Sequence, residues 1–222
     1  MAITRLQHAG ASGETVAFGS NVTSGSLLVL CYTGAEAPAP TDSLGNTWIK
    51  FADEPQPGVP HFCEIWYCIS ASSGANTVDA NTLYNFGYLW VAEYSGVDGT
   101  PADKATSQNW ADSGSLTVFD SGNTATTSQA DELLIGLVSC TNTSATHSWD
   151  SPWTALLDST GTYRTISVAE RIVAATGAYK ASGTNSTSVY WAAAIATFKA
   201  SAGTSGKGIL RRFLRWHFWR RK

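Results

Sequence analysis

The two halves of this chain of 222 residues repeat the same order of apolar and turn-forming segments at an offset of about 105 residues. In the first half, an apolar run at 26–31 leads through a polar stretch to a turn and Trp48. In the second half, a run at 132–140 leads to a turn and Trp153. The later segments pair as 64–69 with 170–174, 73–75 with 176–178, and 89–94 with 193–198. We therefore expect two related units.

The repeated segments are predicted to be β-strands. They are short, rich in β-branched and aromatic residues, and separated by Gly, Asn, Asp, Ser and Pro, and no helical period runs through them. Continuous apolar runs at 27–31 and 133–138 are typical of central strands covered on both faces. The segments 15–18 and 115–119 are shorter and more polar, which favours edge strands.

The fold expected from this pattern is all-β. Two related units, about 3–98 and 113–199, would close into a jelly-roll-like β-sandwich over residues 1–200 with pseudo-twofold symmetry. Two separate domains of about 100 residues each are the alternative. The segment 98–112 lacks the composition of a flexible linker, which favours one body.

Charge is distributed unevenly along the chain. The formal net charge is −3, but residues 203–222 hold seven of the fourteen Lys and Arg and no acid. Residues 1–202 therefore carry seven basic and seventeen acidic residues, a formal charge of −10. An acidic body argues against nucleic acid as a partner.

The basic C-terminus differs in composition from the rest of the chain. Residues 201–207 read as a flexible linker, and 208–222 would form a short amphipathic helix in contact with a partner. The residues expected to dock are Arg211, Arg212, Phe213, Leu214, Arg215 and Trp216. The partner could be an anionic membrane, the acidic body of the same or a neighbouring subunit, or a groove on a larger assembly; an engineered appendage is a further alternative. We favour docking in an assembly and a homo-oligomer.

The four cysteines are expected to be free. Cys63 and Cys68 would point to opposite faces of one strand and could not bridge each other. Cys31 and Cys140 each end an apolar strand and could pair across the sandwich, but buried thiols are the favoured reading. The N-terminus shows no signal-peptide pattern, so we expect synthesis in the cytoplasm. The final location that we expect is a virion or an extracellular surface.

Two acidic residues in apolar strands are the candidates for catalysis. Glu64 and Glu170 are read as matching repeat positions, and a carboxylate pair can hydrolyse glycosides at a suitable separation. Equivalent positions in a pseudo-symmetric sandwich usually lie far apart. Outward-facing or Arg-paired carboxylates are therefore favoured, and we predict no enzymatic activity.

Metal binding is not expected either. His61 and Cys63 would share one strand face, but two ligands without a second pair are a weak zinc signal. The loops at Asp42 and Asp150 carry oxygen acceptors that could bind calcium, although Asp, Gly and Asn are also what tight turns require. We favour turns, and we expect no cofactor.

Aromatic residues are the better functional lead. Alternation along residues 86–90 places Phe86, Tyr88 and Trp90 on one strand face. If that face is exposed, it could bind a sugar ring or a partner. If it is internal, the three side chains are core, which is the favoured reading.

Three phrases carry a resemblance to known proteins: Ser20 to Val29, Asp42 to Trp48 and Val91 to Val97. They resemble a poorly characterised β-sandwich family found in bacterial surface proteins and tailed-phage structural proteins. The resemblance covers about residues 3–199 and excludes the basic tail. It implies a lectin-like or jelly-roll sandwich used for display, adhesion or particle decoration, and it carries no catalytic motif.

The function expected first is that of a non-enzymatic structural or adhesion protein of a phage-like particle, of the head-decoration or fibre type. A carbohydrate-binding module that uses an exposed aromatic strip is the alternative. An enzyme acting on polysaccharide ranks third.

Overall fold

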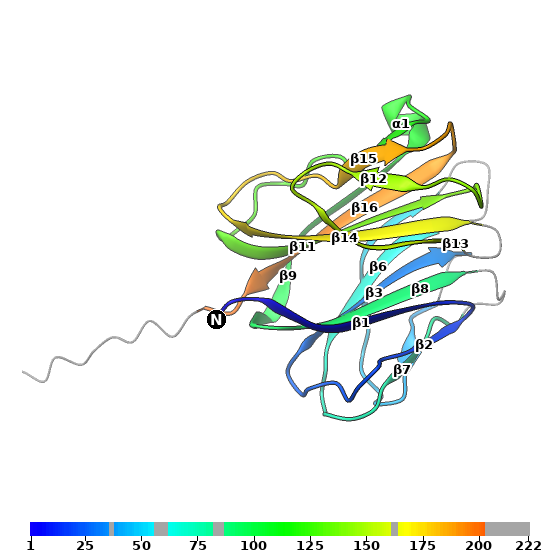
Figure 1. The fold of residues 1–222 in the computed structure, drawn as a ribbon. Helices are drawn as coiled ribbons and strands as arrows, with labels where there is room; N and C mark the ends of the chain where they lie inside the picture. Colours follow the sequence, from blue (N-terminus) through cyan, green and yellow to red (C-terminus); the bar gives the residue numbers. More distant parts are fainter. Residues whose placement is uncertain (36–37, 56–61, 82–86, 161–163, 203–222) are drawn as a thin grey trace, which may run out of the picture.

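The computed structural model describes residues 1–35, 38–55, 62–81, 87–160 and 164–202, and nearly all of its regular structure is β-strand (Figure 1). The only helix in these ranges is α1 (Trp110–Ser113). The described part contains no helix of the length and apolarity needed to span a membrane. The all-β prediction is therefore confirmed.

Two five-stranded antiparallel sheets form the centre of the molecule. The first has the order β1 (Thr4–Ser12), β8 (Tyr88–Ser95), β3 (Leu27–Gly34), β6 (Phe62–Ile69) and β5 (Ile49–Pro55). The second has the order β9 (Val97–Asn109), β16 (Trp191–Ala200), β11 (Asp131–Cys140), β14 (Thr165–Ala174) and β13 (Thr154–Thr160). The continuous apolar runs form β3 and β11, which lie at the centre of their sheets as predicted.

A three-stranded sheet covers the outer face of each large sheet. The first consists of β2 (Thr15–Ala17), β7 (Thr77–Asp79) and β4 (Thr41–Asp42). The second consists of β10 (Val118–Asp120), β15 (Ser182–Asn185) and β12 (His147–Trp149). The more polar segments form β2 and β10, which are edge strands as expected.

The strand order shows that the sequence repeat is a structural repeat. Each unit has a five-stranded and a three-stranded sheet, and equivalent strands occur in the same order along the chain and across each sheet. Each unit is thus itself a small sandwich, a detail that the sequence did not indicate. The second unit begins with β9 at Val97, the counterpart of β1, whereas the sequence placed its start near residue 113.

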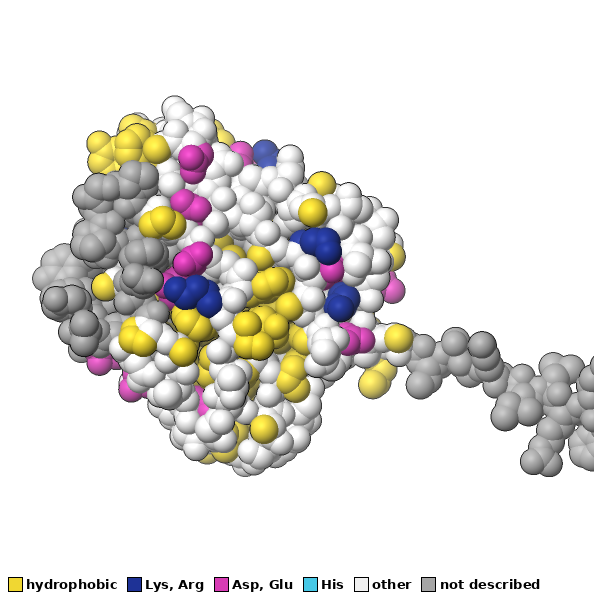
Figure 2. Space-filling model, turned by 180° about the vertical axis from the view of Figure 1, so that it is seen from behind, with side chains coloured by type: hydrophobic (Ala, Val, Ile, Leu, Met, Phe, Trp, Pro, Cys, Tyr) yellow, Lys and Arg dark blue, Asp and Glu magenta, His cyan; other side chains and the backbone are white. Residues whose placement is uncertain are grey.

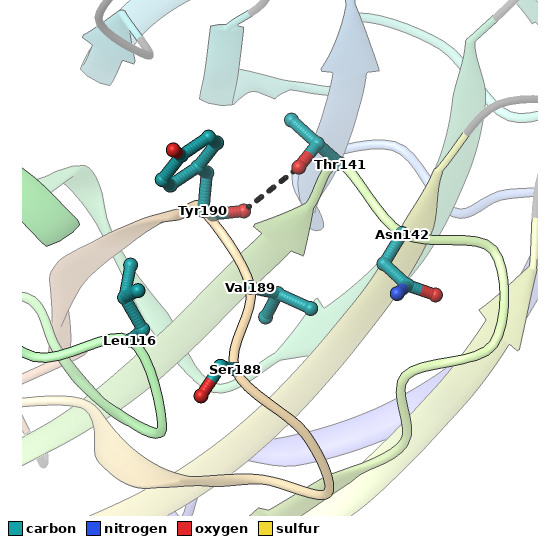
Figure 3. Close-up of a pocket in the computed structure, with 6 residues that line it drawn as sticks. All are labelled: Leu116, Thr141, Asn142, Ser188, Val189 and Tyr190. Carbon is teal, nitrogen blue, oxygen red and sulfur yellow. Dashed lines mark hydrogen bonds between the residues drawn. The ribbon is translucent and has the colours of Figure 1, made fainter.

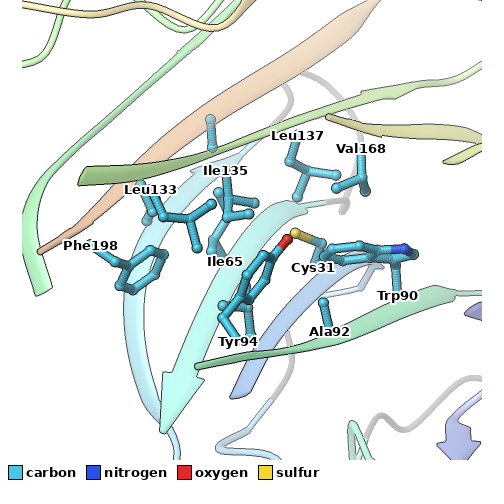
Figure 4. Packing of buried hydrophobic residues seen from close by; sticks show 14 of the residues in the cluster. Cys31, Ile65, Trp90, Ala92, Tyr94, Leu133, Ile135, Leu137, Val168 and Phe198 are labelled. Carbon is cyan, nitrogen blue, oxygen red and sulfur yellow. The ribbon is translucent and has the colours of Figure 1, made fainter. Parts of the chain in front are cut away.

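One apolar core joins the two units, because the large sheets pack face to face (Figure 4). Trp90 and Tyr94 from β8 and Phe198 from β16 are among its fully buried side chains. Smaller cores lie between each large sheet and the small sheet outside it. The central contact also includes a hydrogen bond between the buried hydroxyls of Thr33 and Ser139, one from each unit.

Strand pairing fixes which residues are equivalent in the two units. Leu27 pairs with Tyr94 in the first sheet, and Leu133 pairs with Phe198 in the second. Counting from these pairs, Thr33 is equivalent to Ser139, so the Thr33–Ser139 hydrogen bond joins equivalent residues. Such a contact between equivalent positions fits the predicted pseudo-twofold relation.

The same register corrects the expected match of Glu64 with Glu170. Glu64 pairs with Tyr32 on β3, and the corresponding pair in the second sheet is Val138 with Ser167. Glu170 instead corresponds to Tyr67. The sequence match was three residues out of register, because a lone carboxylate in an apolar strand does not define the pairing of that strand.

All four cysteines are buried and free, as predicted. Cys31 and Cys63 belong to the core between the large sheets, whereas Cys68 and Cys140 lie on the outer faces of their sheets. Cys31 and Cys140 therefore point into different cores. Cys63 and Cys68 point to opposite faces of β6, as their spacing indicated.

Candidate functional site

The expected aromatic strip is internal where the structure describes it. Tyr88 and Trp90 are buried in the core between the large sheets. Figure 4 shows Trp90 within this core. The indole N–H of Trp90 lies 3.2 Å from His8 Nδ1. Phe86 lies outside the described residues. The hypothesis of an exposed strip is therefore wrong for Tyr88 and Trp90, because the face of β8 that carries them packs against the second sheet.

The structure brings together a Cys–His–Asp arrangement that the sequence did not indicate. Cys140 Sγ lies 3.2 Å from His147 Nε2, and His147 Nδ1 lies 2.6 Å from Asp158 Oδ1. The three residues come from β11, β12 and β13, which lie in two different sheets. Nucleophile, base and orienting carboxylate are arranged in this way in cysteine hydrolases.

Burial prevents this arrangement from acting as a nucleophilic centre in the folded state. Cys140 is fully buried, and its thiol is within 3.6 Å of Asn185 Oδ1. Burial raises the pKa of Cys140 to about 12, whereas a reactive cysteine needs an accessible thiolate. The chain of hydrogen bonds therefore satisfies buried polar groups and ties β12 to β11 and β13.

The two predicted carboxylates lie in different surroundings. Glu64 is fully buried and accepts hydrogen bonds from Lys50 Nζ at 2.9 Å and Trp66 Nε1 at 2.7 Å. Glu170 accepts from Arg5 at 2.6 Å and from the Tyr94 hydroxyl at 2.8 Å. Each carboxylate is held by its own hydrogen-bond donors. Glu64 lies on the outer face of its sheet, whereas Glu170 lies on the face toward the central core. The two groups therefore do not face each other across a substrate site.

The loop at Asp42 is built as a turn. Its carboxylate accepts from the backbone N–H groups of Leu44 and Asn46 and from the side chains of Asn46, Trp48 and Asn76. Although burial opposes the effect, these donors lower the pKa of Asp42. Donors thus surround the oxygens that a calcium ion would need.

The weak zinc signal finds no support in the described ranges. Within them, no group of three or more His, Cys, Asp or Glu is placed to hold a metal ion. Cys63 lies in the central core with its thiol near the carbonyl oxygen of Leu137. His61 lies outside the described residues.

Glu132 is a buried carboxyl with an unusual environment. It is fully buried at the start of β11, and no hydrogen bond of ordinary length and angle reaches its oxygens, although the Thr197 hydroxyl and the Gln129 N–H lie near enough to lower its pKa. Burial raises the pKa of Glu132 to about 7, and the neighbouring Asp103 adds to the rise. Asp103 stays ionised: against the effect of burial, donors that include Ser128 N–H and Lys104 Nζ hold its pKa at about 2.

An open apolar groove runs along the side where β5 meets β9. We call it the seam groove. Its apolar lining consists of Ile49, Tyr67 and Ile69 of the first unit and Pro101 and Ala102 of the second, and Thr47, Cys68, Gly99 and Thr100 complete it. Figure 2 shows hydrophobic side chains gathered along the middle of this face, with basic and acidic side chains beside them. The groove has a volume of about 310 Å³.

One aromatic residue, Tyr67, lines the seam groove, and two further rings pack behind it. Tyr67 packs edge-on against Phe51 and Phe198, with ring centroids 5.5 and 5.6 Å apart. Ile49 is 48% exposed at its margin. Further along, a hydrogen bond of 2.7 Å from the Ser107 hydroxyl to the carbonyl oxygen of Asp53 holds the two edge strands together. The groove is therefore the place where the central core reaches the surface, at one end of the contact between β5 and β9.

A second concave site lies at one end of the second unit. We call it the Tyr190 pocket, because Tyr190 lies at its margin (Figure 3). Its volume is about 290 Å³, and none of its lining residues is charged. The lining residues are Leu116, Thr141, Asn142, Ser188, Val189 and Tyr190.

Sequence reasoning missed both concave sites, since each combines short stretches that are far apart in the chain. The six residues of the expected docking tail, Arg211 to Trp216, lie outside the described residues. The chain matches no protein-family model, and comparisons with curated proteins and with solved structures also found no match.

Proposed function

We propose that this chain is a non-enzymatic structural or adhesion protein of a phage-like particle, and that it assembles by placing its basic tail in the seam groove of a second copy. The observation that supports the proposal is the seam groove, where the core between the two units reaches the surface. The particle setting rests on the sequence resemblance. Chemistry-bearing groups such as Cys140 and Glu64 are enclosed in the sandwich, which favours binding over catalysis.

The chain leaves the body beside this groove. Ala200 pairs with Val97, and Ser201 N–H donates to the carbonyl oxygen of Gly96, immediately before the stretch of β9 that lines the groove. The apolar residues of 208–222 would meet the ring of Tyr67, and its basic residues would meet the acidic body. A reciprocal exchange of tails gives a closed dimer with two equal contacts.

Light scattering after size-exclusion chromatography tests this proposal on the full chain and on a chain that ends at Ala202. The full chain should form a defined oligomer and the shortened chain a monomer. If both chains are monomers, the proposal that the chain assembles through its tail is wrong.

Two matched substitutions locate the contact. Ile49 in the groove and Val118 on β10 have nearly equal exposed fractions, 48% and 47%. Ile49→Asp should convert the full chain to a monomer, because it places a charge in an apolar contact. Val118→Asp should leave the oligomer intact. Equal effects of the two variants would contradict docking in the seam groove.

A further inference from the structure

The Tyr190 pocket has the chemistry of a saccharide site. We infer that it binds one ring of a neutral sugar, with the exposed Tyr190 side chain as its aromatic contact. This inference is independent of the tail and of the seam groove. It also differs from the expected strip at residues 86–90, because every residue that lines the pocket lies in the second unit.

The aromatic part of the site is an exposed ring on a firm support. Tyr190 is 48% exposed, and its ring stacks on Trp110 with centroids 4.5 Å apart and an interplanar angle of 29°. Trp110 opens α1, where the Asn109 side chain caps the helix and also donates to Glu54 at 2.7 Å. Trp110 is thus a positioning residue that supports the partly exposed ring of Tyr190. Exposed aromatic rings are suited to the apolar faces of sugars.

The rest of the pocket offers a small apolar floor and neutral polar groups. Leu116 and Val189 provide the apolar part, and Thr141, Asn142 and Ser188 provide hydroxyl and amide groups (Figure 3). Ligand sites commonly combine an apolar lining with a few placed polar groups, and the volume of about 290 Å³ is near the lower end of their range. An uncharged lining of this size fits a neutral sugar ring better than a charged metabolite.

Backbone hydrogen bonds hold the walls of the pocket together. Val189 N–H donates to the carbonyl oxygen of Leu116 at 3.0 Å, and Thr141 N–H donates to that of Tyr190 at 3.1 Å. Nearby, the indole N–H of Trp191 donates to the carbonyl oxygen of Ser115 at 2.9 Å. The three segments that form the site are therefore fixed relative to one another before a ligand arrives, which lowers the entropic cost of binding.

Calorimetric titration of the full chain tests the inference with a panel of neutral hexoses, 6-deoxyhexoses and N-acetylhexosamines as methyl glycosides, and with uronic acids as charged comparators. At least one neutral glycoside should bind. Tyr190→Ala should weaken that binding about ten-fold, because the stacking contact is lost. Tyr190→Phe, which keeps the ring, should stay within about three-fold of the unchanged chain.

A control variant separates a local effect from a general one. Ile172 is also exposed, at 55%, but lies on β14 away from the pocket, so Ile172→Ala should leave saccharide binding unchanged. Retention on an immobilised polysaccharide then shows whether the bound sugar ring belongs to a surface glycan or to a free sugar. Failure of every neutral glycoside to bind, stronger binding of uronic acids, or full binding by Tyr190→Ala would overturn the inference.

Discussion

The two units share a strand order but differ in chemistry at equivalent positions, most clearly on the two flanks of the core between them. On one flank, Tyr67 packs against Phe198 beside the seam groove. By strand register the equivalent pair on the other flank is Glu170 and Tyr94, where the Tyr94 hydroxyl donates to the carboxylate at 2.8 Å and Arg5 adds an ion pair. One flank is apolar and the other is held by charge.

A second difference concerns carboxyl groups that occupy exchanged positions. In the first unit Ser26 lies beside Glu93, whose oxygens accept from Ser26, Thr23 and Gln7. In the second unit the equivalent positions hold Glu132 and Thr197. One buried glutamate thus accepts three short hydrogen bonds, whereas the other has only the Thr197 hydroxyl and the Gln129 N–H near it, outside ordinary hydrogen-bond geometry.

These differences show that the backbone pattern does not depend on one set of buried polar contacts. Apolar strands at fixed intervals specify both units, while the side chains at each flank have diverged. The flank with an aromatic opening is therefore where we expect a binding surface. Single substitutions at equivalent positions can test how far the two units differ.

The largest effect is expected in the shared core. Trp90 is fully buried there, and its equivalent in the second unit is the much smaller Ala194. Trp90→Ala should lower the free energy of unfolding by about 3–5 kcal/mol, and Ala194→Gly by only about 1 kcal/mol. Urea denaturation should show one transition for both variants. Two separate transitions, with only one shifted, would contradict a core shared by the units.

A smaller loss is expected at the carboxylate that has donors. Glu93→Gln should lower the free energy of unfolding by about 2 kcal/mol, because an amide cannot accept from the donors that face both oxygens. Urea denaturation near neutral pH measures the change. An unchanged stability would show that these hydrogen bonds add nothing beyond burial.

The same Glu-to-Gln change at Glu132, the carboxyl at the exchanged position of the second unit, should have the opposite sign. Glu132 has a pKa of about 7 when folded, against an ordinary value of 4.5, so the folded chain binds the extra proton between these values. Stability due to this group should therefore fall as pH rises from 4.5 to about 7. Glu132→Gln should remove that fall and raise stability above pH 7 by about 1 kcal/mol.

Thermal unfolding across this pH range measures both effects. Glu93→Gln run in parallel controls for the loss of one formal charge from the body. If Glu132→Gln is less stable than the unchanged chain at every pH, the claim that Glu132 is protonated in the folded chain is wrong.

The smallest effect is expected on the charged flank. Tyr94→Phe removes the hydroxyl that donates to Glu170. The residue equivalent to Tyr94 in the second unit is Phe198, so a phenyl ring already occupies this position of the strand there. The free energy of unfolding should fall by about 1 kcal/mol. Phe198→Tyr is the matched comparison. A loss as large as that of Trp90→Ala would mean that this flank, rather than the apolar core, holds the units together.

Sequence reasoning identified the repeat, the all-β class and the central strands, because apolar runs such as 27–31 and 133–138 carry that information locally. It did not locate the sites. Whether Trp90 faces water or a second sheet depends on how the two units pack, and no local pattern encodes that packing. Cys140, His147 and Asp158 likewise meet only through the pairing and stacking of three strands.

Hydrogen exchange on the full chain and on the chain ending at Ala202 tests the central claim, that the apolar flank is the binding surface, most directly. If the tail occupies the seam groove, amides of β5 and β9 should exchange more slowly in the full chain. Amides of β2 and β10 on the outer sheets should not change. Equal exchange of β5 and β9 in the two chains would contradict the claim.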